Sequence, residues 1–118
     1  MSRSQIKIIV NFEIINYSEF VSIAKESIHY CRKYEPNTLV YDWYVDQENK
    51  YGRLIEVYSD VEAFRAHVTG RIFSDIGPKY KGVVHWLSLQ AFGELPHEFD
   101  HILKAVPSVL WPEPLLAL

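Results

Sequence analysis

The order of strand-like and helix-like patterns along the chain is the feature that most restricts its fold. Within residues 6–14, Ile6, Ile8 and Val10 recur at a spacing of two, which is typical of a strand. Further patterns follow in the order helix, strand, strand, helix, strand, over residues 18–35, 38–46, 51–59, 61–76 and 83–92. This order predicts a single sheet with two helices packed against it.

The two helical segments have recognisable starts and stops. Ser18 and Asp60 are predicted N-caps, and the segments end before Pro36 and Pro78. Cys31 lies on the apolar stripe of the first helix, so we expect a buried small hydrophobe there and not a nucleophile. The sequence therefore predicts β-α-β-β-α-β, the split βαβ order of ferredoxin-like α+β folds, with an antiparallel sheet and both helices on one face.

The last predicted strand is apolar on both faces if its side chains alternate regularly. Its apolar residues divide into two sets, Val84, Trp86 and Phe92 on one face and Leu87, Leu89 and Ala91 on the other. The two helices can cover only one face, and a sheet that is apolar on both sides needs cover on each. We therefore expect a homodimer in which a second copy covers the open face.

Composition and charge exclude several classes of protein. A length of 118 residues fits one domain, and a net charge of −3 without any run of Lys or Arg argues against nucleic-acid binding. The single Cys31 cannot form an internal disulfide and suits a reducing compartment. Residues 1–5 lead into a short apolar run that Asn11 and Glu13 interrupt, so we expect no secretory signal, no membrane span and a cytoplasmic protein.

Residues 93–118 form an extension beyond the predicted domain of residues 1–92. Apolar residues at helical spacing in its first half are Leu95, Phe99, Ile102, Leu103 and Val106. They predict a short amphipathic helix. Residues 109–116 then form an apolar tail with two prolines, too hydrophobic to remain loose in water. We expect the extension to pack on its own domain or on the dimer partner.

The extension also contains His-Glu-Phe-Asp-His at residues 97–101, which matches the H-E-x-x-H pattern of zinc proteases. Such a site needs both histidines in a cleft together with a third ligand. Here both histidines would lie opposite the apolar stripe, and Glu113 is the only acidic or histidine side chain that follows. We predict no metal site.

Two segments resemble the antibiotic biosynthesis monooxygenase (ABM) family. Residues 35–41, Glu-Pro-Asn-Thr-Leu-Val-Tyr, resemble the family's Glu-Pro-Gly-x-Leu-x-Tyr opening of the second strand. Residues 56–67 carry its Glu-x-Tyr-x-Asp-x-x-Ala-Phe-x-x-His signature. The resemblance covers about residues 6–92, and it implies a dimeric α+β barrel with a pocket between helices and sheet in each subunit.

The resemblance also implies candidate activities and site residues. Family members oxygenate quinols and aromatic polyketides without a cofactor, and others degrade heme, although the Trp of the heme-degrading branch is missing from the second helix here. His67 is the expected proton carrier. Asn11, on the opposite strand face from Ile8, is the expected donor to developing negative charge on the substrate. Structural roles in packing or at a sheet edge are open alternatives for both residues.

Five more side chains are expected to shape a substrate pocket: Tyr41, Trp43, Glu56, Tyr58 and Trp86. Aromatic walls with a few polar groups suit a flat organic ligand, and they suit a dimer core equally well. Two functions follow. One is a cofactor-independent monooxygenase, or a related small oxidoreductase, acting on an aromatic or quinol-like molecule. The other is a non-catalytic dimeric protein that binds a small hydrophobic ligand.

Overall fold

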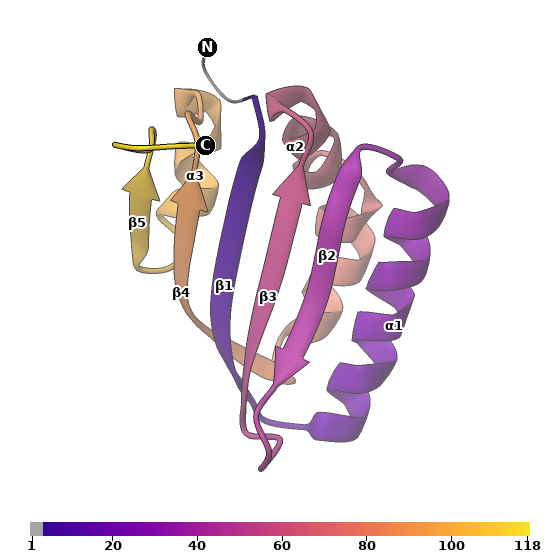
Figure 1. Cartoon of the computed structure of the whole chain (residues 1–118). Helices are drawn as coiled ribbons and strands as arrows, with labels where there is room; N and C mark the ends of the chain where they lie inside the picture. Colours follow the sequence, from indigo (N-terminus) through magenta and orange to yellow (C-terminus); the bar gives the residue numbers. More distant parts are fainter. Residues whose placement is uncertain (1–3) are drawn as a thin grey trace.

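The computed structural model describes residues 4–118 and has the predicted element order (Figure 1). The elements are β1 (Ile6–Ile14), α1 (Tyr17–Tyr34), β2 (Thr38–Val45), β3 (Tyr51–Tyr58), α2 (Val61–Val68), β4 (Val84–Phe92), α3 (Asp100–Leu103) and β5 (Ser108–Trp111). A π-helical turn (Ile72–Ile76) and two 3-10 turns (Gly77–Tyr80 and His97–Phe99) complete the helical structure of these residues. Residues 1–3, part of the stretch in which no leader is expected, lie outside the described residues.

The sheet has the strand order β2-β3-β1-β4-β5. The first four strands pair antiparallel, which confirms the predicted ferredoxin-like α+β arrangement. Figure 1 shows α1 and α2 against one side of this sheet. The fifth strand was not predicted. It pairs parallel with β4, so the complete sheet is mixed.

The ends of the helices differ in part from the prediction. The side chain of Asn16, not Ser18, caps α1 by accepting a 3.1 Å hydrogen bond from the backbone of Glu19. Asp60 caps α2 as predicted, accepting from the backbone of Ala63 at 2.9 Å. Helix α2 ends at Val68, earlier than its apolar pattern suggested. The chain continues in the π-helical turn Ile72–Ile76 and the 3-10 turn Gly77–Tyr80.

A bulge in β4 corrects the prediction that this strand is apolar on both faces. Asn11 pairs with Ser88, whereas the next residue of β1, Phe12, pairs with Trp86, so Leu87 is the extra residue. One extra residue reverses the alternation of side chains beyond it. As a result, Trp86 and Leu89 line the same cavity on the helix side, although regular alternation would have separated them.

The face of the sheet away from the helices is mixed in character. Ile9 and Ile55 pair across β1 and β3 on this face and are half-buried. Beside them Asn11 accepts a hydrogen bond from Arg53 at 2.8 Å and donates one to Ser88 at 3.0 Å. No element among residues 4–118 covers this face. The homodimer that would cover it stays a prediction.

The extension packs on its own sheet. Phe99 is 2% exposed and lies edge-on to Phe64 of α2, with ring centroids 4.9 Å apart. The side chain of Arg65 binds Glu98 and lies over the ring of Phe99. The division of the chain at residues 92 and 93 stays a prediction. None of the helices within residues 4–118 is long and apolar enough to cross a membrane.

Candidate functional site

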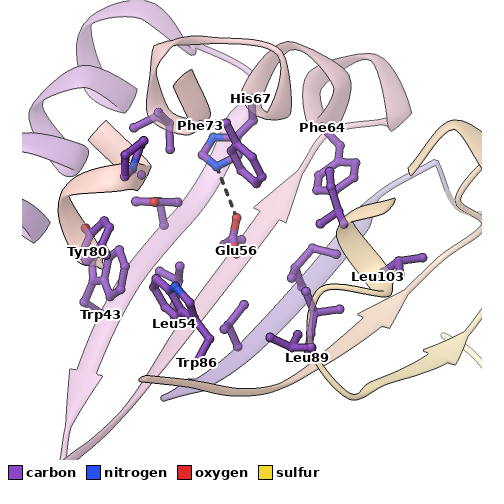
Figure 2. A pocket seen from close by; sticks show the side chains of 18 residues that line it. Trp43, Leu54, Glu56, Phe64, His67, Phe73, Tyr80, Trp86, Leu89 and Leu103 are labelled. Carbon is purple, nitrogen blue, oxygen red and sulfur yellow. Dashed lines mark ion pairs between the residues drawn. The ribbon is translucent and has the colours of Figure 1, made fainter. Parts of the chain in front are cut away.

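A cavity of about 320 Å³ lies between the helix side of the sheet and helix α2. Strand alternation explains its floor, because Leu54 and Glu56 of β3 both point toward the helices. Its wall is mostly apolar, and its volume falls within the range of small-molecule sites, roughly 300–1,000 Å³. Among the polar groups of the cavity, the imidazole of His67 and the carboxyl of Glu56 lie next to each other (Figure 2).

His67 is 1% exposed and lies between two carboxyl groups. Its Nδ1 is 2.8 Å from Oε1 of Glu35, the residue that caps the C-terminus of α1. Its Nε2 is 3.6 Å from Oε1 of Glu56, the contact drawn as a dashed line in Figure 2. The hydroxyl of Tyr58, two residues further along β3, donates a hydrogen bond to the same carboxyl oxygen of Glu56. Three elements, α1, α2 and β3, therefore bring these groups into one buried row.

The two carboxyl groups differ in the environment that sets their pKa values. Burial acts to raise the pKa of Glu35, but hydrogen bonds from His67 and Thr38 outweigh it and hold the pKa below its ordinary value. At Glu56, burial raises the pKa and outweighs the opposing effects of His67 and Tyr58. Two titratable groups whose pKa values are pushed apart are a common arrangement in acid–base sites.

This difference fixes the role of each imidazole nitrogen. Glu35 is ionised and can only accept, so Nδ1 of His67 carries the proton of their 2.8 Å hydrogen bond. In neutral His67, Nε2 is then the free acceptor, and it faces Glu56 and the cavity. Burial, followed by the nearby charge of Glu56, raises the pKa of Tyr58 well above its ordinary value, so this phenol stays a donor.

Most of the predicted site residues are brought together. Five of them line the cavity: Tyr41, Trp43, Glu56, His67 and Trp86. Tyr58 is completely buried beside Glu56 and supports the site through its hydrogen bond to that residue. His67 is interior, and residues from the segment 72–80 form part of the same cavity wall. The ring of Phe73 lies 5.7 Å from that of His67.

The structure does not bring Asn11 to this cavity, so a role for it beside His67 stays a prediction. Odd-numbered residues of β1 face away from the helices, and Asn11 bonds there to Arg53 and Ser88. The sheet itself separates Asn11 from His67. The carboxyl of Glu56, whose pKa is raised by burial, lies on the helix side beside His67 instead.

Glu35 was not among the predicted site residues, although the sequence contains a signal for it. It continues the buried stripe of α1 at a spacing of four from Cys31, beyond Ala24 and Ser27. A carboxylate on the buried face of a helix requires a charged or donating partner. His67 is that partner, 32 residues later in the sequence.

The same side chains form a compact group that could be considered for metal binding. Sγ of Cys31, a carboxylate oxygen of Glu35 and a ring nitrogen of His67 lie within 4.8 Å of one another. Burial, and then the charge of Glu35, raises the pKa of Cys31, so it remains a thiol, whereas metal ligation requires the thiolate. The thiol instead donates to Glu35 at 3.8 Å. The chemistry of this donor set therefore favours hydrogen bonding.

The two histidines of the H-E-x-x-H motif lie on the solvent side, where the sequence pattern placed them. The side chain of His97 is fully exposed, His101 is exposed, and Glu98 is paired with Arg65.

No family model and no curated protein matches the sequence. Solved structures do match. MupZ from Pseudomonas fluorescens is 19% identical, with a TM-score of 0.75 over 98% of this chain and 94% of that chain. SnoaB, a cofactor-independent oxygenase from Streptomyces nogalater, is 14% identical, with a TM-score of 0.67 over 79% of this chain and 95% of that chain.

A third match is a candidate antibiotic biosynthesis monooxygenase from Caulobacter crescentus, 14% identical, with a TM-score of 0.63 over 80% of this chain and 94% of that chain. The second and third structures match nearly their whole length and leave about a fifth of this chain unmatched. At such low identities the similarity establishes the fold and nothing finer. The chain therefore has the ferredoxin-like α+β fold of a group of solved structures that includes a cofactor-independent oxygenase and candidate antibiotic biosynthesis monooxygenases.

Proposed function

We propose that the chain is a cofactor-independent monooxygenase acting on a hydroxylated aromatic, a phenol or quinol, with His67 as the general base. The observation that supports this most directly is the buried row Glu35–His67–Glu56 at the polar part of an otherwise apolar cavity. A histidine held by a carboxylate at one nitrogen and free at the other is a common proton acceptor in catalysis.

The first step is removal of the hydroxyl proton by Nε2 of His67. Glu35 holds the ring in the required tautomer and stabilises the imidazolium that forms, because its carboxylate accepts the Nδ1 proton at 2.8 Å. Phe73 lies against the imidazole and limits access of water to it. The transfer therefore takes place in a region of low dielectric, where the Glu35–His67 attraction is stronger than in water.

The substrate anion would be stabilised by Glu56. Nε2 of His67 and Oε1 of Glu56 are 3.6 Å apart. One substrate oxygen can therefore lie at a hydrogen-bonding distance of about 2.8 Å from both. In this proposal Glu56, whose pKa burial raises, carries a proton when the substrate is bound and donates it in a hydrogen bond to the oxygen that His67 has deprotonated. In this proposal Glu56 takes the role first expected of Asn11, and Trp43 and Trp86 hold the ring.

The anion itself supplies the electrons for the oxidation, and O2 is the oxidant. In a balanced monooxygenation of a phenol to a quinone, the substrate loses its hydroxyl hydrogen and the hydrogen of one ring carbon, and that carbon gains one oxygen atom as a carbonyl. The second oxygen atom leaves as water. Removing the hydroxyl proton makes the substrate a better electron donor, so the protein's contribution is to form and hold the anion.

Oxygen uptake with a panel of phenols and quinols tests this proposal. His67→Gln should lower the rate by about 10²–10⁴-fold, the usual contribution of a general base. His97→Ala, which removes a fully exposed histidine, serves as the control and should leave the rate unchanged. A rate that does not exceed the uncatalysed oxidation, or that survives His67→Gln, would contradict the proposal.

A non-catalytic protein that binds a hydrophobic ligand is the second candidate. The observation in its favour is that Asn11 does not reach the cavity, so a two-residue site of the kind predicted from the sequence is not formed. Ligand binding without oxygen uptake, in both the parent protein and the His67→Gln variant, is the outcome that would support it.

We also propose that the protein forms a homodimer through the open face of the sheet. This face carries half-buried Ile9 and Ile55, and no element among residues 4–118 packs on it. Sedimentation at micromolar concentration tests the dimer.

Cytoplasmic location is likewise proposed, with the single buried thiol of Cys31 as its support.

A further inference from the structure

The wall of the cavity changes in character from one side to the other. On one side lie the rings of Trp43, Tyr80 and Trp86. The ring centroid of Tyr80 is 5.4 Å from that of Trp43 and 5.5 Å from that of Trp86. On the other side the wall is mostly aliphatic, and Figure 2 shows Leu89 and Leu103 there together with Phe64, across the cavity from Trp43 and Tyr80. His67 and Glu56 lie between the two sides. A ligand that fills the cavity therefore meets aromatic, polar and aliphatic surfaces in different places.

The extension supplies much of the aliphatic side. Ile102, Leu103 and Val106 all line the cavity, and all come from residues 93–118. Together with Ile8 and Leu89 of the sheet, they present only hydrocarbon to the cavity. Such a wall can bind a ligand only through burial of apolar surface, because it offers no side-chain hydrogen bond.

This part of the wall is fixed in place by several contacts. Ser108 donates to the backbone carbonyl of Leu103 at 2.6 Å, and β5 pairs with β4 immediately beyond it. On the other side, Phe99 is buried against Phe64, and Glu98 is paired with Arg65. Leu103 therefore lies on a preformed surface and can limit the length of a bound group.

We propose that the substrate carries an aliphatic chain on its hydroxylated ring, and that residues 102–106 determine the chain length that is accepted. The inference rests on the proposed function for the position of the ring, whose oxygen contacts His67 and Glu56. With the ring against the side formed by Trp43, Tyr80 and Trp86, a chain directed away from them reaches the side formed by Leu89, Leu103 and their neighbours.

Calorimetric binding of 4-alkylphenols without oxygen tests the proposal separately from turnover. Affinity should rise about fourfold per added methylene, the equivalent of about 0.8 kcal/mol for each buried CH2 at 25 °C, up to a limiting length. Leu103→Trp should move this limit to shorter chains, and Leu103→Ala should move it to longer ones. Leu116→Ala, at a side chain that is 87% exposed, is the control and should change nothing.

The outcomes separate this proposal from the monooxygenase proposal. Affinity that is independent of chain length, or a limit that neither Leu103 variant moves, would overturn it even if oxygen uptake is observed. A chain-length limit that Leu103 moves, in a protein that takes up no oxygen, would support the aliphatic site and overturn the oxygenase. Circular dichroism checks that Leu103→Trp is folded, and Leu103→Ala provides the test if it is not.

Discussion

Oε1 of Glu35 and Nδ1 of His67 lie 2.8 Å apart in the interior, and this contact joins the end of α1 to the last turn of α2. Thr38 and Cys31 donate to the same oxygen of Glu35, at 2.8 and 3.8 Å. The carboxylate is therefore held by three side-chain donors. Its position leaves Nε2 of His67 as the nitrogen that meets the cavity.

Replacing Glu35 by Gln should impair the base without removing it. A Gln side chain can present its amide to Nδ1, which favours the tautomer with the proton on Nε2, where it cannot accept the substrate proton. We expect kcat for oxygen uptake to fall by about 10²-fold or more, with KM changed only a few-fold.

Glu26→Gln is the matched control for this change. Glu26 is an exposed carboxylate on α1 that pairs with Lys79 at 2.7 Å and does not line the cavity. The kcat of the Glu26→Gln variant should equal that of the parent protein. A kcat for Glu35→Gln equal to that of the control would remove Glu35 from the proposed mechanism.

The lowered pKa of Glu35 predicts a stability contribution that depends on pH. A carboxyl whose pKa is below the ordinary 4.5 in the folded protein stabilises the fold above that pH. This stabilisation is lost as the pH falls through the folded-state value. Urea unfolding should therefore show Glu35→Gln less stable than the parent at pH 7, with the difference shrinking below about pH 4.5. A difference that grows toward low pH would contradict the assignment.

Glu56 should show the opposite dependence on pH. Its pKa is raised above 4.5 in the folded protein, so its favourable contribution is present below that value and is lost as the pH rises through the folded-state pKa. The stability of Glu56→Gln relative to the parent should accordingly improve as the pH increases from 4 to 8. Measuring both variants in one urea series makes each the control for the other.

The body of the fold was accessible from the sequence because periodicity and caps determine its elements locally. Alternation identified β1 to β4, and Asp60 marked the start of α2. The bulge at Leu87 was not accessible, because it depends on pairing with β1, a strand more than 70 residues earlier. Strand β5 was missed for a similar reason, since only its pairing with β4 makes residues 108–111 a strand.

For the site, the sequence indicated residue types but not which face of the sheet each would occupy relative to the helices. Alternation correctly placed Asn11 and Ile8 on opposite faces of the strand. The expectation that Asn11 and His67 act together came from the family resemblance, which does not say whether the two side chains lie on the same face of the sheet. In the sequence, Glu35 stands at the end of the first predicted helix and opens the Glu-Pro-Asn motif. Its role as partner of His67 depends on the packing of α1 against α2, which no local pattern reveals.

The open face of the sheet provides a prediction about assembly. Ile55 lies half-buried on this face, beside Arg53, and a second copy would bury it fully. Replacing it by Asp would leave a charge without a partner in that interface. Sedimentation should give a dimer for the parent and a monomer for Ile55→Asp, whereas Ile15→Asp, at a side chain that is 61% exposed outside the sheet, should remain dimeric.

A monomeric parent protein at micromolar concentration would refute the assembly prediction directly. A dimer that survives Ile55→Asp would show that the copies associate elsewhere, and the apolar residues of the C-terminal tail would then be the next surface to substitute. Circular dichroism of Ile55→Asp should match the parent, because the residue faces away from both core clusters of the chain.

Phe99 gives the sharpest test of how the extension is attached to the rest of the chain. Its ring is buried between Phe64 and the side chain of Arg65, and Ile102 and Leu103 follow it into the cavity wall. Phe99→Ala removes a buried ring and should lower the free energy of unfolding by about 3–5 kcal/mol if the extension unfolds together with the sheet. If the extension detaches by itself, global stability should change little, while limited proteolysis cuts after residue 93 faster than in the parent.

In both cases Phe99→Ala should lower the affinity for long-chain alkylphenols more than the affinity for phenol, because the aliphatic side of the cavity is lost and the His67 side is kept. Equal losses for the two ligands would show that the extension contributes stability alone and does not contact the bound chain.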